Sequence, residues 1–409
     1  MSLFEDGPEY KKRLATDYTL PKVTLKDIHA AVPKELWEKS TLKGLAWAAR
    51  DTLLCTVFYF AATYIDPLAQ ALEASNINPR AVFTIKWSLW ATYWWFQGLA
   101  GAALFLLGHD AGHGTLSENK LINHTIGFIA HTVIFNPYFS WRHTHNLHHK
   151  FNGSMERDEA YVPLTRSSFG MAPEKVMKPN DYQEILGETP LWTLCRMLVM
   201  QGLGWQWYLT LNVWGNPIYP LGTNHFLPSS PLFRKSDRLP VIISNVGMLA
   251  WAAVLCRWIY VTSFTTYIKY YFIPYILTNH WSVMFSFIQH TDPTIPHFRG
   301  ETWTFLRGAA GTIDRPLLGW MGRFFLHNVA HDHVAHHFFS TVPFWNVPEL
   351  SKHVRKALGD DYNCDSGSSL RAYYRTFTQC LFVEDEGDIV FYKNKQGKRV
   401  RKAAGEAEL

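Results

Sequence analysis

Eight histidines fall in three short groups whose spacing is typical of metal ligands. The groups are His109 and His113; His145, His148 and His149; and His333, His336 and His337. Residues at positions i, i+3 and i+4 of a helix share one face, so each group can direct two or three imidazoles at one point. Neutral imidazole is a good ligand for iron, zinc or copper. Eight such ligands exceed the four of a tetrahedral zinc ion, so their number favours two metal ions over one closed zinc site.

Other polar residues near these groups admit two interpretations. His290 comes directly after an apolar segment and fits either an additional ligand or an ordinary residue at the end of a membrane span. Four acidic residues either accept the second ring N–H of a ligand imidazole or are simply solvated. These residues are Asp110, Glu156, Asp158 and Asp332.

Four apolar segments must position the histidines. They cover residues 44–65, 87–108, 239–256 and 270–289. A helix of about 20 residues crosses a hydrocarbon core of about 30 Å. Short connections join the segments in pairs, so each pair is expected to form a hairpin that returns to its starting side. Lysine and arginine are frequent before the first segment, which favours a cytosolic N-terminus.

Two details of these segments affect the topology. Pro274 is expected to kink the last segment without ending it, because neighbouring helices can satisfy the carbonyl that a proline frees. Residues 197–214 are long enough to span, but polar residues interrupt them, and we interpret them as a helix lying along the membrane surface. Only if this helix does not cross do all three histidine groups face the cytosol.

The predicted fold is an all-α integral membrane protein with four transmembrane helices in two hairpins, interfacial helices and a cytosolic histidine-ligated di-metal domain. Its expected parts are a cytosolic N-terminal segment (1–47), the first hairpin (48–108), a cytosolic region with the first two histidine groups (109–238), the second hairpin (239–289), and a cytosolic region with the third group and the tail (290–409).

Composition excludes several classes of protein. Of the 409 residues, 47% are hydrophobic and only 18% are charged, which excludes a disordered chain. A net charge of +5 is weak for a nucleic-acid partner, and we expect none. Five cysteines without a Cys-x-x-Cys motif give neither a disulfide framework nor a thiolate metal site.

Two alternative functions use metal differently. In a membrane zinc hydrolase, His109 and His113 would imitate a His-Glu-x-x-His motif with Asp110 as the base, which leaves six clustered histidines unexplained. A metal transporter would place its polar ligands at the bilayer midplane, whereas these groups lie outside the apolar segments.

The motifs resemble those of the membrane fatty acid desaturases, most closely the acyl-lipid delta-12 (oleate) and omega-3 desaturases of plants and fungi. The similarity covers most of the chain. It includes His-Asp-x-Gly-His at 109–113, His-x-x-His-His at 145–149 followed by Met-Glu-Arg-Asp-Glu, Gln-His-Thr at 289–291, His-Val-Ala-His-His at 333–337, and the C-terminal stretch 382–391.

This resemblance implies a di-iron centre held by the eight grouped histidines, with His290 as an additional ligand. It implies O2 as co-substrate, and electrons from NADH-cytochrome b5 reductase through cytochrome b5. The sequence contains no His-Pro-Gly-Gly haem motif, so cytochrome b5 is expected as a separate partner. The resemblance also implies a multi-pass protein of the endoplasmic reticulum membrane with a cytosolic active site.

The implied reaction is insertion of a cis double bond into a membrane-lipid-linked acyl chain, with a C18 chain and delta-12 position expected. An acyl chain has no polar handle along its length, so a long apolar tunnel must set the reacting position. Residues on the second and fourth segments are tunnel candidates, with ordinary membrane-facing aromatics as the alternative. The candidates are Trp94, Phe96, Tyr275, Trp281 and Phe285.

Two departures from the usual pattern keep related reactions open. Ala111 stands where this group usually has cysteine, and Asn146-Leu147 replaces a basic pair in the second motif. Neither removes a candidate ligand. They leave room for a fatty acyl hydroxylase, acetylenase or conjugase, which differ in the fate of the radical after the first hydrogen is removed.

Overall fold

The computed structural model describes residues 5–405, and the chain is mostly helical, as predicted. The longer helices are α3 (Thr41–Ala62), α4 (Ile65–Ala74), α5 (Pro79–His113), α6 (Lys120–Thr132), α7 (Tyr138–Phe151), α9 (Pro190–Leu211), α10 (Arg238–Val261), α12 (Ile273–His290), α16 (Val347–Leu358) and α17 (Ser369–Gln379). The shorter helices are α1 (Pro8–Leu14), α2 (Leu25–Ala30), α8 (Pro179–Leu186), α11 (Phe264–Tyr267), α13 (Phe305–Ala310), α14 (Trp320–Phe325) and α15 (His333–Phe338). Two short antiparallel strands, β1 (His297–Phe298) and β2 (Ile389–Val390), form a small sheet.

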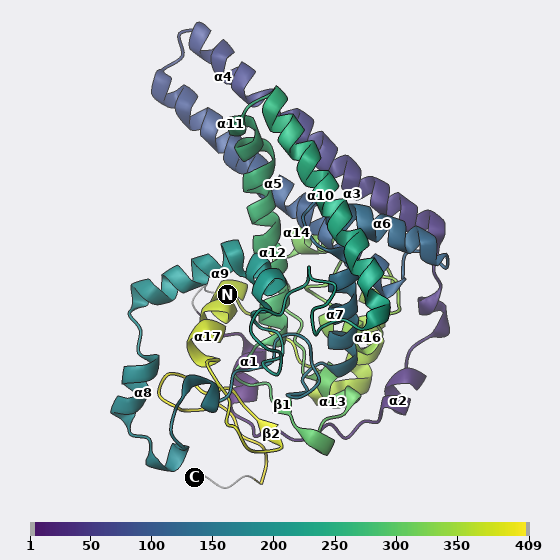
Figure 1. Cartoon of the computed structure of the whole chain (residues 1–409). Coiled ribbons are helices and arrows are strands. Elements are labelled where there is room, and N and C mark those ends of the chain that lie inside the picture. Colours follow the sequence, from purple (N-terminus) through teal and green to yellow (C-terminus); the bar gives the residue numbers. More distant parts are fainter. Residues whose placement is uncertain (1–4, 406–409) are drawn as a thin grey trace.

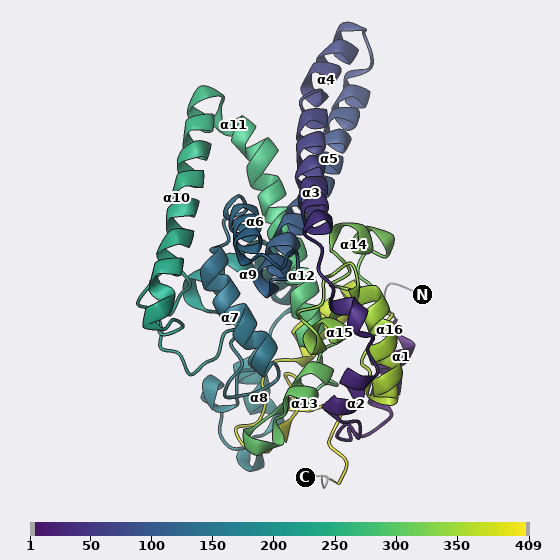
Figure 2. The ribbon, with the colours of Figure 1, turned by 90° about the vertical axis from the view of Figure 1, so that its right-hand side faces the viewer.

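Two helical hairpins project from one side of a broader body. The first consists of α3, α4 and α5 and the second of α10, α11 and α12, and both views show them pointing the same way (Figures 1 and 2). Two helical stretches are long and apolar enough to cross a membrane, Thr41–Ala74 and Lys235–Val261. Both leave most of their apolar residues exposed, as expected of helices that face lipid.

In the first hairpin, α3 has the expected length but lies three residues earlier in the chain than 44–65, whereas α5 is longer than the expected 87–108. α3 begins at Thr41, where the side chain of Ser40 accepts a hydrogen bond from the Lys43 N–H and so caps the helix. α5 runs unbroken over 35 residues and ends at His113; the next residue, Gly114, has a φ of 73°, the left-handed conformation that closes many helices. The helix therefore continues past residue 108, where the expected apolar segment ends. The first histidine pair lies on the last turn of the same helix that forms the hairpin.

Pro274 is accommodated as predicted. A π-helical turn, Ile268–Phe272, comes directly before α12, so the helix continues through the proline. Proline lacks an N–H, which leaves the carbonyl of Tyr270 without its usual helical donor. The hydroxyl of Tyr93, on α5, donates to that carbonyl at 2.8 Å. The neighbouring hairpin thus satisfies the freed group.

α5 and α12 form the closest helix pair in the centre of the molecule. A Cβ at Gly101 of α5 would overlap the hydroxyl of Thr278 on α12, so only glycine allows this approach. Below this contact the two helices carry a continuous buried core, which includes Phe105, Phe285 and Ile288. The packed pair fixes the ends of both helices relative to each other.

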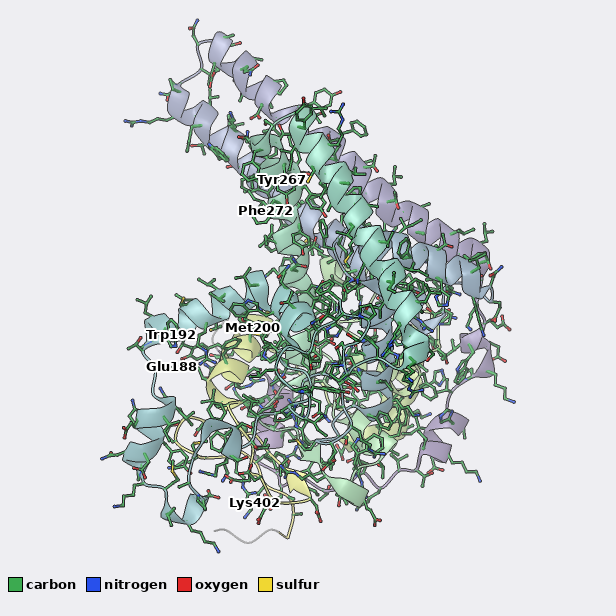
Figure 3. All side chains as sticks on the ribbon, viewed as in Figure 1. Glu188, Trp192, Met200, Tyr267, Phe272 and Lys402 are labelled. Carbon is green, nitrogen blue, oxygen red and sulfur yellow. The ribbon has the colours of Figure 1, made fainter. Side chains whose placement is uncertain are left out.

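α9 runs across the base of the projecting helices, and one of its faces is exposed (Figure 1). Along it, Trp192 lies near the outer end and Met200 nearer the centre of the molecule (Figure 3). Met200 is buried, whereas Trp192, Leu198 and Leu203 are exposed apolar residues. This distribution suits a helix that covers the body with one face and meets lipid with the other.

Both ends of the described chain pack on the body. The Tyr18 N–H donates to the Lys402 carbonyl, and the Ala404 N–H donates to the Tyr18 carbonyl, both at 2.8 Å. Lys393 is buried and pairs with Glu174 at 2.6 Å and Glu384 at 2.7 Å. The basic tail is therefore tied to the rest of the molecule by specific contacts.

Candidate metal centre

Four helices bring the candidate ligands together. The first pair comes from the last turn of α5, the second group from α7, the third from the short helix α15, and His290 is the last residue of α12. These helices are far apart in the sequence. All nine histidines named from the sequence converge on one region, where the structure divides them into two groups.

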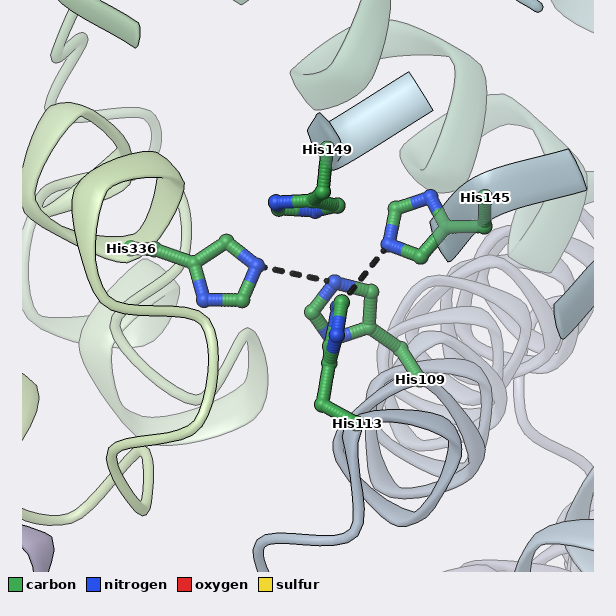
Figure 4. A group of neighbouring side chains, drawn as sticks. All are labelled: His109, His113, His145, His149 and His336. Atoms are coloured by element: carbon green, nitrogen blue, oxygen red, sulfur yellow. Dashed lines mark hydrogen bonds between the residues drawn. The ribbon is translucent and has the colours of Figure 1, made fainter. Parts of the chain in front are cut away.

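The first group contains five histidines with ligand nitrogens within 4.8 Å of one another (Figure 4). Nε2 of His113 is 3.1 Å from Nε2 of His145, and Nε2 of His336 is 3.2 Å from Nε2 of His109. His149 completes the group. Each of the three sequence motifs contributes to it.

The second group lies directly beside the first. Ligand nitrogens of His148, His290 and His337 are within 4.8 Å of one another. Nε2 of His333 is 2.8 Å from Nε2 of His290, which adds a fourth imidazole. The rings of His149 and His337 stack at 4.1 Å and connect the two groups.

The protonation of these side chains suits metal binding. Desolvation, followed by the mutual repulsion of neighbouring histidines, lowers the pKa values of His113, His145, His149, His290, His333 and His337 well below their ordinary value. The same causes lower the pKa of His336 to about 3. Both ring nitrogens of His149 and of His337 lack a hydrogen-bond partner in the described protein. Uncharged imidazoles with converging free lone pairs fit two metal ions.

The four acidic candidates differ in position. Asp158 accepts a hydrogen bond from Nδ1 of His148 at 2.7 Å, and Oδ1 of Asp110 is 3.3 Å from Nδ1 of His109. Burial raises the pKa of Asp110, but contacts with His109 and His327 outweigh burial and hold it at about 2.

The carboxylates of Asp332 and Glu156 pair with none of the nine imidazoles. Asp332 pairs instead with Arg323 at 2.9 Å, and exposed Glu156 accepts a hydrogen bond from the Ser154 hydroxyl. Only two of the four carboxylates therefore face a candidate ligand.

An apolar cavity borders both groups. It holds about 730 Å³ of atom-free space, part of it open to the outside, and His109, His145, His148, His290 and His333 line one end. Most of its wall is aromatic or aliphatic and comes from α5, α7, α9 and α12. The wall includes Phe105, Trp141, Met200, Trp205, Tyr208, Val283, Phe285 and Phe287.

Of the five aromatic tunnel candidates, Phe285 lines this cavity. The other four lie elsewhere in the hairpins. The Trp94 indole donates to the Lys269 carbonyl at 2.9 Å, and Phe96 packs between Phe58 and Phe325. The Tyr275 hydroxyl accepts a hydrogen bond from the Gln206 amide. Trp281 packs edge-on against Trp95. A wider tunnel role for these four stays a prediction.

The part of the cavity wall that α9 contributes was not predicted from the sequence. Met200, Gly204, Trp205 and Tyr208 recur at the spacing of one helical face and are buried. That periodicity was the available signal, but apolar residues also cover the opposite face and obscure it. Tyr161 and Trp214, from the loops on either side, complete this wall and gave no local signal.

A second, larger cavity continues outward from the first. The two share Tyr161, Met200, Trp214 and Phe287. The outer cavity runs along α9, and the ion pair between Arg196 and Glu188, at 2.6 Å, lies in its wall. The two cavities thus adjoin on the side of α9.

One buried histidine outside the three motifs lies close to the site. Nε2 of His327 donates to Asp51 Oδ2 at 2.9 Å, and its Nδ1 is 3.6 Å from Asp110 Oδ2. Burial would lower the pKa of His327, but the two carboxylates outweigh burial and raise it. A single histidine at no special spacing gives no sequence signal.

Comparison with known proteins agrees with this geometry. Residues 86–365 match the family described as fatty acid desaturase. Delta(12) fatty acid desaturases of Mortierella isabellina and Mortierella alpina are each 37% identical over 388 residues, which covers 94% of both chains. An oleate hydroxylase of Claviceps purpurea is 35% identical and covers 92% of this chain and 82% of the relative. The chain belongs to the fatty acid desaturase family and is an oxidoreductase of lipid metabolism.

Proposed function

We propose that this protein uses O2 to introduce a cis double bond into a membrane-lipid-linked acyl chain, at the delta-12 position of a C18 chain. The observation that carries the proposal is the meeting of two histidine groups with one end of an apolar cavity. The delta(12) names of the two Mortierella relatives support the position.

Two iron ions are the proposed cofactor. The five-histidine group would hold one, and His148, His290, His333 and His337 would hold the other. Bound iron supplies the oxidising power that removal of hydrogen from an unactivated methylene requires, which redox-inert zinc does not. A zinc hydrolase built on His109 and His113 alone would leave the other seven histidines without a role.

The protein's own part is to hold the chain and exclude water. Val283, Phe285 and Phe287 offer an apolar wall directly beside His290, and a methylene chain gains free energy when it leaves water for such a wall. Trp141 stacks on the ring of His145 at 4.3 Å, which fixes that imidazole at the cavity end. The bound chain would thus be fixed in position next to the histidines.

The overall reaction sets the need for electrons. Loss of two hydrogens from the chain provides two of the four electrons that reduce O2 to two molecules of water, so two electrons and two protons must come from elsewhere. We propose cytochrome b5, itself reduced by NADH-cytochrome b5 reductase, as the electron source. This proposal rests on the family resemblance.

A multi-pass topology in the endoplasmic reticulum membrane belongs to the same proposal. The four spans would be α3, α5, α10 and α12, with both hairpins entering from the cytosolic side. The common direction of the hairpins and the apolar outer face of α9 support this topology. The outer cavity beside α9 would then admit an acyl chain laterally from the cytosolic leaflet.

Hydroxylation is the second candidate function. The Claviceps relative named as an oleate hydroxylase is almost as similar to this chain as the delta(12) desaturases. Both outcomes begin with removal of one hydrogen from the chain. They differ in whether a second hydrogen is removed or oxygen is added.

Expression in yeast followed by lipid profiling tests the proposal. We expect a new C18 dienoic acid that disappears in His336→Ala and persists in His353→Ala, a control outside both histidine groups. A hydroxylated C18 acid in its place would indicate the second candidate. An unchanged lipid profile, with the protein present in the membrane fraction, would contradict both.

A further inference from the structure

A row of charged side chains connects helix α3 to the first histidine group. His327 lies between Asp51 of α3 and Asp110 of α5, and all three side chains are buried. Its Nε2 donates to Asp51 at 2.9 Å, and its Nδ1 is 3.6 Å from Asp110. The other oxygen of Asp110 is 3.3 Å from Nδ1 of His109. His327 therefore contacts the carboxylate that faces His109.

The row ends at the surface on Arg50. Its guanidinium contacts Asp51 at 2.5 Å and is partly exposed. The charges alternate along Arg50, Asp51, His327 and Asp110, so each buried charge has an opposite neighbour. Buried charges are tolerated when they are paired in this way.

The ring of His327 is held firmly. It stacks on Phe344 at 4.2 Å with an interplanar angle of 9°, and Trp47 packs edge-on against it at 5.7 Å. Its backbone φ of 44° is a left-handed conformation that is unfavourable for a residue with a side chain. A strained conformation persists only where the surroundings maintain it. Here, packing and Asp51 hold the ring next to Asp110.

The two carboxylates that face candidate ligands are supported differently. Asp158 accepts hydrogen bonds from the backbone N–H groups of Gly153 and Ala160 as well as from His148. The ionisable groups within 4 Å of the Asp110 carboxylate, among residues 5–405, are His109 and His327. Asp110 thus depends on His327 where Asp158 depends on its own loop.

We propose that His327 is a positioning residue of the metal centre: fixed by Asp51, it orients the Asp110 carboxylate toward Nδ1 of His109. Helix α3 would thereby help to set the geometry of a ligand that it does not touch. The inference rests on the proposed iron site. A carboxylate on the outer nitrogen of a metal-bound histidine fixes the orientation of the ring and raises its basicity.

The test measures iron binding to the purified full-length protein, without substrate. We expect His327→Gln to weaken iron binding by about 10- to 100-fold, the usual effect of removing such a partner. The Mössbauer spectrum of the iron that remains bound should change, because the imidazole of His109 would take another orientation. His225→Gln replaces another buried histidine, one outside both groups, and should leave affinity and spectrum as in the wild type.

A double variant separates positioning from folding. His327→Gln leaves two buried carboxylates without the cation between them, and this alone lowers stability. Adding Asp51→Asn removes one of those charges, so the thermal midpoint should recover while iron binding stays weak. Recovery of both would mean that His327 only neutralises Asp51, and would overturn the proposal.

The wild-type protein distinguishes the two levels of inference. If the wild type binds no iron, the proposed function fails. If the wild type binds iron and His327→Gln binds it equally well with an unchanged spectrum, the positioning role alone fails.

Discussion

Asp158 holds His148 by its outer nitrogen: the Nδ1 of His148 donates to Oδ1 of Asp158 at 2.7 Å, and both side chains are buried. This contact leaves Nε2 of His148 free to face Nε2 of His290 at 3.3 Å. The carboxylate is itself fixed by the backbone N–H groups of Gly153 and Ala160. The tautomer and direction of His148 thus follow from one aspartate.

Replacing this aspartate should weaken the binding of the second metal ion. We expect Asp158→Asn to reduce iron affinity by about 10- to 100-fold, because the amide is a poorer acceptor and no longer favours the tautomer with hydrogen on Nδ1. Iron per polypeptide after equilibration with a competing chelator measures the effect. Glu156→Gln, two residues away and exposed, is the matched control and should bind iron normally. Equal iron affinity in the two variants would count against the role of Asp158.

Filling the cavity should block the substrate and spare the metal. Met200 is buried and lines both the inner and the outer cavity, so Met200→Trp places a large ring in the path of an acyl chain. We expect desaturation to fall about 100-fold, since small displacements of a reacting group have effects of this size. Iron content should not change.

The control for this prediction is Leu203→Trp on the same helix. Leu203 is 44% exposed, so an added ring there points away from the cavity. Desaturation by this variant should match the wild type. Full activity of Met200→Trp would show that the chain does not pass this residue.

A glycine pair tests the packing of the two central helices. In Gly101→Ala the new methyl would overlap Thr278, and the forced separation of α5 and α12 should lower stability by about 1–3 kcal/mol. In Gly202→Ala, on α9, the methyl meets nothing within 4 Å and should raise stability by up to about 1 kcal/mol through helix propensity. Thermal midpoints in one detergent compare the two. Equal midpoints would contradict the close approach at Gly101.

Acid should destabilise the metal-free protein. Seven of the nine histidines have pKa values lowered in the fold, whereas in the unfolded chain they titrate near about 6.5. Below that pH the unfolded state takes up protons that the folded state does not, so the free energy of unfolding falls as pH falls. Asp314, whose pKa burial raises to about 7, and His327, whose pKa is also raised, act in the opposite sense, but the seven histidines outnumber them.

Thermal midpoints of chelator-treated protein between pH 7.5 and 5.5 would measure this dependence. The midpoint should drop most steeply below about pH 6.5. A midpoint that stays constant or rises on acidification would contradict the neutral state of the clustered histidines.

The sequence predicted the convergence of the histidines well, because spacing on a helix determines which side chains share a face. It did not predict their division. His145 and His149 join the first group while His148 joins the second, although the three are almost adjacent. The direction of each ring depends on where α12 and α15 approach α7, and that is a tertiary relationship. His290, for which two interpretations stood open, lies within the second group.

The limits of the fold prediction have similar causes. Hydrophobicity identified the centre of α5, but its ends are set by Asn78, which caps the first turn, and by Gly114. Trp94 was a candidate for the cavity wall, yet it does not line the cavity, and its indole N–H donates to the carbonyl of Lys269. The sequence does not show whether an aromatic residue of an apolar helix lines a cavity or packs elsewhere. That depends on which residues surround it in the folded protein.

The spread of the histidines along the chain has a consequence for biogenesis. His109 is made early, but its group also needs His336, and Asp292, next to the second group, is paired with Arg375 of α17 at 3.2 Å. During translation the first hairpin can enter the bilayer long before these partners leave the ribosome. Complete assembly of the histidine groups must therefore wait until most of the chain has been made. Until then the nascent protein carries a membrane anchor and an unfinished coordination site.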